Sequence, residues 1–109
     1  MKATTLFFPS CAVAALLTCP AAYSQASAKA LYDAKCLVCH GATGLADSNV
    51  AKLMKVKPVT DASVYTMPED EMIREVREGA GKMEPYKGTL TAAQIRALVD
   101  YFQTFTKRQ

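Results

Sequence analysis

Apolar side chains recur every three or four residues in three stretches of this chain, 27–39, 66–79 and 91–108. That spacing places them on one side of an α-helix, because the helix completes a turn about every 3.6 residues. We find no stretch that alternates apolar and polar residues convincingly enough to predict a strand. The pattern therefore predicts an all-α protein built from short helices.

Residues that favour helix ends refine the second stretch. Thr66 and Glu69 have the spacing of a capping box, and Pro68 suits a first helical turn. Gly79 follows the last apolar position and favours termination. We therefore expect one helix from Thr66 to Gly79, with its buried side formed by Met72, Ile73 and Val76.

The last stretch begins in the same way. Thr91 and Gln94 form a second capping box, and Leu90 with Ile95 can form a hydrophobic staple. One face of the helix then carries Ile95, Leu98, Val99, Phe102 and Phe105, and Lys107 and Arg108 lie at its C-terminal end.

The segments between these helices are short and broken. Glycine and polar residues predict a loop over 41–50, followed by one or two helical turns over 50–55 and a further short helix within 57–65. Gly81, Pro85 and Gly88 predict an extended loop over 80–90.

The first 26 residues have the pattern of an export signal. Lys2 precedes an apolar run over 6–17, and small residues follow it. We expect cleavage after Ala26, with the bond after Ser24 as the alternative, so that a single domain spans 27–109 and the protein lies in the periplasm. A retained N-terminal helix and a lipid anchor at Cys19 are the other interpretations, and the run is too short to span a bilayer comfortably.

The composition of the remaining residues excludes some classes of protein. Without Lys2, the basic residues exceed the ten acidic ones by only two, which does not fit a nucleic-acid-binding protein. A domain this small buries little core by itself and usually needs a covalent cross-link or a bound cofactor to be stable. Two cysteines remain after cleavage, Cys36 and Cys39.

These two cysteines lie in the motif Cys36-x-x-Cys39-His40, which contains the chain's one histidine. A structural zinc site needs four ligands, and no further cysteine or histidine follows. A dithiol redox centre would lie in a βαβ pattern, and a disulfide between these cysteines would close too small a loop to stabilise much. Covalent attachment of haem uses all three residues, with both thiols forming thioethers and His40 binding the iron.

The second axial ligand must come from elsewhere, because no other histidine is available. A methionine thioether is the natural partner of a histidine on haem iron. Core packing accounts for Met54, Met67 and Met72, which lie in or beside helical segments. Met83 lies in the loop rich in glycine and proline, so we expect it to be the distal ligand.

The chain resembles the small monohaem class I cytochromes c of bacteria, which are exported. The matching segments are Ala28-x-x-Leu31-Tyr32-x-x-x-Cys36-x-x-Cys39-His40-Gly41, Gly79-x-Gly81-Lys82-Met83, Tyr86-x-Gly88-x-Leu90-Thr91 and Leu98-x-x-Tyr101. The resemblance implies a cytochrome c fold, in which short helices surround one covalently bound haem c and the N- and C-terminal helices cross. The chain differs from many relatives in two places. They have proline directly after the ligand methionine, where this chain has Glu84. They also have a proline-containing loop whose carbonyl accepts the ring N–H of the histidine that corresponds to His40, whereas this chain lacks a proline near Asn49.

The resemblance implies an electron carrier and not an enzyme. Single electrons would pass between redox proteins that dock transiently, and we expect a monomer with no membrane span and no nucleic-acid partner. Lys35, Lys82 and Lys87 would steer an acidic partner, or are ordinary solvated lysines. The alternatives are an electron-entry subunit of one dehydrogenase or oxidase, and a peroxidase-like haem enzyme if no methionine binds the iron.

Overall fold

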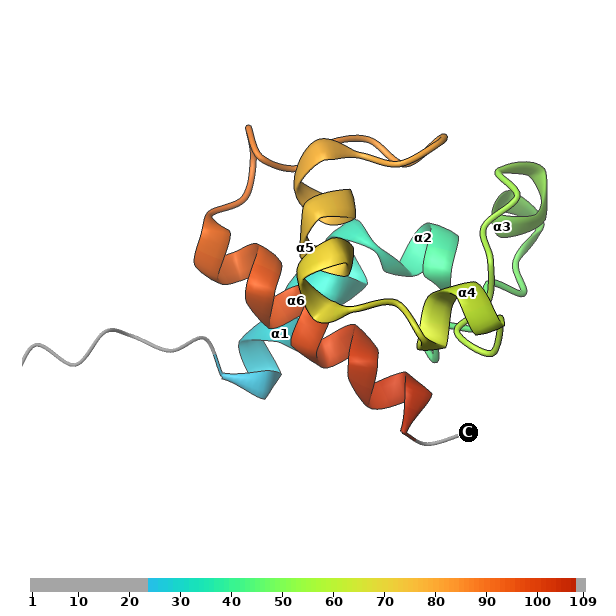
Figure 1. Ribbon diagram of the computed structural model, residues 1–109, viewed down its shortest axis with the longest axis horizontal. Coiled ribbons are helices and arrows are strands. Elements are labelled where there is room, and N and C mark those ends of the chain that lie inside the picture. Colours follow the sequence, from blue (N-terminus) through green and yellow to red (C-terminus); the bar gives the residue numbers. More distant parts are fainter. Residues whose placement is uncertain (1–23, 108–109) are drawn as a thin grey trace, which may run out of the picture.

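The computed structural model describes residues 24–107 of the chain (Figure 1). Among these residues there is no strand, only an isolated antiparallel bridge between Ala80 and Met83. The prediction of an all-α protein is therefore confirmed. The helices are α1 (Gln25–Lys35), α2 (Leu37–His40), α3 (Asn49–Leu53), α4 (Ala62–Tyr65), α5 (Glu69–Glu78) and α6 (Ala92–Thr106).

Nearly all of the expected export signal lies outside the described residues, so its cleavage stays a prediction. Ser24 is the first described residue. Its hydroxyl accepts a hydrogen bond from the Ser27 N–H and caps α1. No helix in 24–107 has the length and apolar character needed to cross a membrane.

Helices α1 and α6 cross in contact, as the resemblance implied (Figure 1). The Tyr32 ring packs edge-on against the rings of Tyr101 and Phe105, with centroids 5.3 and 5.5 Å apart. Ala28, one turn earlier on α1, is buried. Edge-to-face packing of aromatic rings adds to the hydrophobic gain of burying them. The core continues through Val59, Leu90, Ile95 and Leu98.

The first helix is shorter than the apolar spacing predicted. Helix α1 ends at Lys35, and Cys36 serves both as its C-cap and as the N-cap of α2. Leu37 and Val38, which follow, are 37% and 60% exposed, so this turn has no apolar face to bury. The spacing of Cys36 and Cys39 fits a helix face, but here both residues line a cavity.

The prediction of a capping box between Thr66 and Glu69 is also wrong. Thr66 is the C-cap of α4, and its hydroxyl donates to the Ala62 carbonyl at 2.6 Å. Because that side chain is already satisfied by the preceding turn, α5 begins only at Glu69, after Pro68. The Glu69 carboxylate accepts instead from Arg96 of α6 at 3.0 Å.

The other two helix-end predictions are confirmed. At the start of α6, Thr91 and Gln94 exchange both hydrogen bonds of the capping box, at 3.1 and 2.8 Å. Gly79 ends α5 in a conformation with φ +83°, which favours glycine.

Candidate functional site

A cavity of about 870 Å³ lies among the end of α1, α2, α4, α5, α6 and two loops, 54–57 and 80–86. Cavities that hold cofactors usually measure about 300–1,000 Å³ and have mainly apolar walls. The apolar part of this wall includes Met72 and Val76 of α5 and Leu98, Val99 and Phe102 of α6. The cavity is therefore large enough and apolar enough for a planar organic cofactor.

Three predicted site residues, Cys36, Cys39 and His40, line this cavity together. The N–H groups of Cys39 and His40 both donate to the Cys36 carbonyl, at 3.2 and 2.9 Å, and so close the single turn of α2. Residues three apart share a face of a helix. The turn thus presents both thiols to one cavity and carries the imidazole directly after them.

The chain reverses immediately after His40. Gly41 adopts φ +79°, and its carbonyl accepts from the Tyr32 hydroxyl at 2.7 Å. The His40 carbonyl accepts from the Ala46 N–H at 3.0 Å. Burial raises the pKa of Tyr32 well above its usual value, so this hydroxyl remains a donor. These contacts fasten the backbone at His40 to the α1–α6 core.

The His40 ring lies against Phe102 of α6, edge to face, with centroids 5.4 Å apart. Its Nδ1 atom is buried and has no hydrogen-bond partner among the described residues. The resemblance implied that a backbone carbonyl accepts the ring N–H of His40, and this hydrogen bond is absent among the described residues. Burial lowers the pKa of His40, which favours the neutral imidazole that binds metals.

Cys36 and Cys39 are both free thiols in the structure. Burial, and to a smaller extent the neighbouring Cys39, raise the pKa of Cys36 to about 11. Dithiol redox centres show the opposite, a thiol pKa lowered by nearby positive charge or a helix N-terminus. The environment of Cys36 therefore disfavours redox chemistry of that kind.

The sequence singled out Met83, but the structure brings all four candidate methionines to the cavity: Met54, Met67, Met72 and Met83. Of these, Met72 is the most deeply buried and belongs to the packed face of α5, as expected. Met83 lies in the loop, where its N–H donates to the Ala80 carbonyl at 2.8 Å and its carbonyl accepts from the Ala80 N–H at 3.2 Å. The backbone at Met83 is thus held in a tight turn.

Gly79 allows this turn to pack against the end of α5. A Cβ atom at this position would lie 2.8 Å from the Met83 carbonyl oxygen and 3.1 Å from the Pro85 nitrogen. Both neighbours are backbone atoms, which cannot move aside as a flexible side chain would. The approach of the Met83 turn to α5 therefore requires glycine here.

We expect Gly79→Ala to lower the free energy of unfolding of the protein by about 1–3 kcal/mol, because the new Cβ meets the backbone of the turn and φ +83° is strained for alanine. Urea denaturation followed by circular dichroism measures the change. Gly88→Ala is the matched control, since a Cβ at Gly88 meets nothing within 4 Å. Equal midpoints for the two variants would contradict this account of the turn.

Glu84 and Tyr86 extend the loop beyond Met83. The Tyr86 hydroxyl donates to the Lys35 carbonyl at 3.2 Å and also contacts a Glu84 carboxylate oxygen at 3.4 Å. Burial is the main reason that the pKa of Tyr86 is raised. The sequence pattern named Tyr86 only within a motif and did not show that it joins this loop to the end of α1.

The sequence pattern also missed the cavity wall formed by Val56, Lys57, Ser63 and Val64. The Lys57 ammonium donates to the Ser63 hydroxyl at 2.7 Å, and that hydroxyl donates to Asp61 at 2.6 Å. Asp61 also caps α4. A helix-capping aspartate followed by serine was the available signal for a turn here, but nothing in it indicated a cavity.

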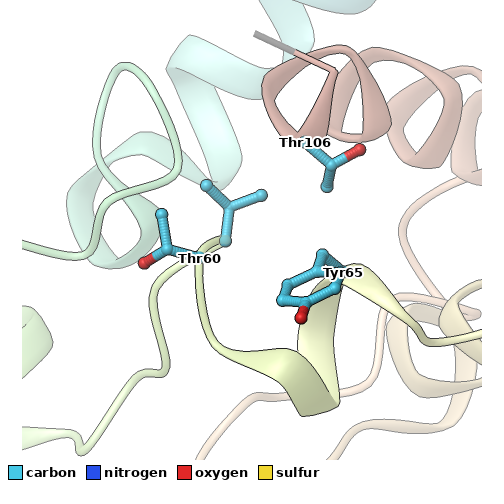
Figure 2. A pocket seen from close by; sticks show the side chains of 4 residues that line it. Thr60, Tyr65 and Thr106 are labelled. Atoms are coloured by element: carbon cyan, nitrogen blue, oxygen red, sulfur yellow. The ribbon is translucent and has the colours of Figure 1, made fainter. Parts of the chain in front are cut away.

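A second, smaller hollow of about 250 Å³ lies between α4 and the end of α6, lined by Val59 and the three residues labelled in Figure 2, Thr60, Tyr65 and Thr106. It contains no cysteine, histidine or methionine. Within 24–107 there is also no group of three or more His, Cys, Asp and Glu side chains placed to hold a metal ion by themselves. The chemistry of the protein is therefore expected in the larger cavity.

The residues of that cavity fit a haem. Two thiols for thioether bonds and a half-buried imidazole share one wall, methionine side chains line other parts, and apolar side chains form much of the remainder. Haem iron in proteins takes these ligand types, histidine and methionine.

Comparison with known proteins agrees with this fit. The family model described as cytochrome c oxidase, cbb3-type, subunit III matches residues 24–102. A solved structure described as KustC0563 c-type cytochrome is similar to the chain, with 26% sequence identity and a TM-score of 0.65, over 72% of this chain and 95% of that one. No curated protein matches significantly.

Proposed function

Because the chain belongs to the cytochrome c family described as cytochrome c oxidase, cbb3-type, subunit III, we propose that it is a periplasmic carrier of single electrons with one haem c. The observation that supports this most directly is the convergence of Cys36, Cys39 and His40 on one large apolar cavity. Haem bound there supplies a one-electron couple between ferrous and ferric iron.

Each residue of the site has a distinct role in this proposal. The Cys36 and Cys39 thiols would hold the haem through thioether bonds, and His40 and Met83 would be the protein ligands of its iron. The Gly41 turn and Phe102 orient the imidazole, while the Ala80–Met83 bridge holds the methionine backbone. If His40 and Met83 both bind the iron, no position on it would be left for substrate, and the chemistry that the haem would supply is electron transfer.

Part of the wall of the site is apolar and packed. Met72 and Val99 are buried, and Leu98 is only 3% exposed. A packed site with a rigid backbone changes little between oxidation states, which favours rapid electron transfer. Lys35 and Lys82 line the cavity and are exposed, and they would attract an acidic redox partner for transient docking.

A potentiometric titration of the purified protein with optical detection tests this proposal. We expect one covalently bound haem, one single-electron transition and, in the ferric state, the weak long-wavelength band that reports a bond between iron and thioether sulfur. The intact mass should equal that of the chain after cleavage at Ala26 plus one haem. A mass without haem would overturn the proposal, and a mass that retains 1–26 would overturn only the export signal.

The family description favours a second candidate, the electron-entry subunit of an oxidase. Such a subunit would hold the same haem domain in a stable complex instead of docking transiently. Purification under gentle conditions distinguishes the two, because a subunit co-purifies with oxidase activity and a free carrier elutes alone from the periplasmic fraction.

A further inference from the structure

Met54 and Lys55, which directly follow α3, line one wall of the cavity. The Val56 N–H donates to the Ala51 carbonyl at 2.9 Å, and the Lys55 N–H donates to the Lys52 carbonyl at 3.2 Å. Together with φ +56° at Lys55, these bonds form a Schellman motif. This arrangement satisfies the carbonyls of the preceding residues but gives no backbone donor to the Leu53 carbonyl within the described residues.

The turn that carries Met83 forms the facing wall. The Ala80–Met83 bridge closes the turn, and the Tyr86 N–H donates to the Val76 carbonyl at 3.1 Å. These bonds fasten the turn to α5 alone. Its tip is open, since a Cβ at Gly81 would meet nothing within 4 Å.

A single side chain joins the two walls. The Lys82 ammonium donates to the Leu53 carbonyl at 3.2 Å, across 29 positions of sequence. Lysine side chains near a helix C-terminus often satisfy its last carbonyls, where the backbone dipoles favour positive charge. Among the hydrogen bonds of the described residues, this is the one that connects the 80–84 turn with α3. We call it the clasp.

We propose that Lys82 is a positioning residue for Met83, and that the clasp holds the tip of the Met83 turn against α3. The inference rests on the proposed function, because the position of Met83 has this importance only if its sulfur binds the iron. Lys82 adjoins Met83 in sequence, so any movement of its backbone is passed directly to the ligand. The clasp therefore restrains the opening motion by which the sulfur would leave the iron.

The holoprotein tests this through two rates. The first is the rate at which imidazole displaces the methionine from ferric iron, followed by loss of the long-wavelength band. The second is the hydrogen exchange of the Met83 amide, which reports opening of the turn whether or not the sulfur binds iron. We expect Lys82→Ala to raise both about fivefold, the change expected from losing one exposed hydrogen bond.

Two further variants separate the clasp from simple charge. Lys82→Arg keeps a donor and should restore rates close to those of the wild type. Lys87→Ala removes the same charge from the same loop, but Lys87 pairs with Glu78 and not with α3, so its rates should stay unchanged.

Unchanged amide exchange in Lys82→Ala, or an equal acceleration in Lys87→Ala, would overturn the inference. If wild-type ferric protein lacked the long-wavelength band, the assignment of Met83 as ligand would fail instead, and amide exchange would still decide whether Lys82 fastens the turn.

Discussion

Simultaneous replacement of Cys36 and Cys39 by alanine is expected to abolish accumulation of folded protein with bound haem. Without thioether bonds the cofactor can dissociate, and the cavity of about 870 Å³ must then collapse or fill with water. Loss of the haem would remove the contacts that it makes with the apolar wall, and a domain this small buries little core without them. We therefore expect the chain without haem to lose most of its folded structure.

Haem staining after denaturing electrophoresis and far-ultraviolet circular dichroism measure the two parts of this result. The matched control is the double replacement of Cys11 and Cys19 by alanine, which changes two thiols within the expected export signal and should leave the haem content unchanged. A double variant of Cys36 and Cys39 that kept stainable haem would contradict the attachment site.

Met83→Ala is expected to leave the haem attached but to lower its reduction potential by about 100 mV or more, since about 59 mV corresponds to each tenfold difference in binding between the two oxidation states. Thioether sulfur is a soft ligand that favours ferrous iron, and its loss therefore stabilises the ferric form. The iron would also become open to added ligands, so the variant should bind imidazole without the slow step of methionine displacement.

The controls are Met54→Leu and Met67→Leu, because both side chains line the same cavity and leucine preserves most of their packing. Their potentials and long-wavelength bands should match those of the wild type. A Met83→Ala protein with an unchanged spectrum, together with loss of the band in one control, would transfer the ligand role to that methionine.

The residue pattern was sufficient for the all-α fold class and for the Cys36, Cys39 and His40 motif that lines the cavity. These features depend on chemistry that is local in sequence. Cys36, Cys39 and His40 lie within five residues, and the capping box at Thr91 involves residues three apart. The crossing followed from Tyr32 and Tyr101 only with the help of the family resemblance.

The same local rules failed where two neighbouring elements compete for one residue. Thr66 could cap the following helix, but its hydroxyl is already bonded to the preceding one. Apolar spacing continued through Cys36, but the chain turns there so that the thiols face a cavity. Sequence spacing alone does not show which of two possible partners a side chain will meet.

The cavity and the contacts across it came from three-dimensional packing. Its walls combine the end of α1, α2, α4, α5, α6 and two loops, and no local pattern shows that Met54, Met67, Met72 and Met83 meet there. The hydrogen bond from Lys82 to Leu53 joins residues 29 apart, through a backbone carbonyl that carries no sequence signal. Residue types thus indicated which chemistry the chain can perform, while long-range packing set the relative positions of the groups, because those positions depend on how separate helices pack.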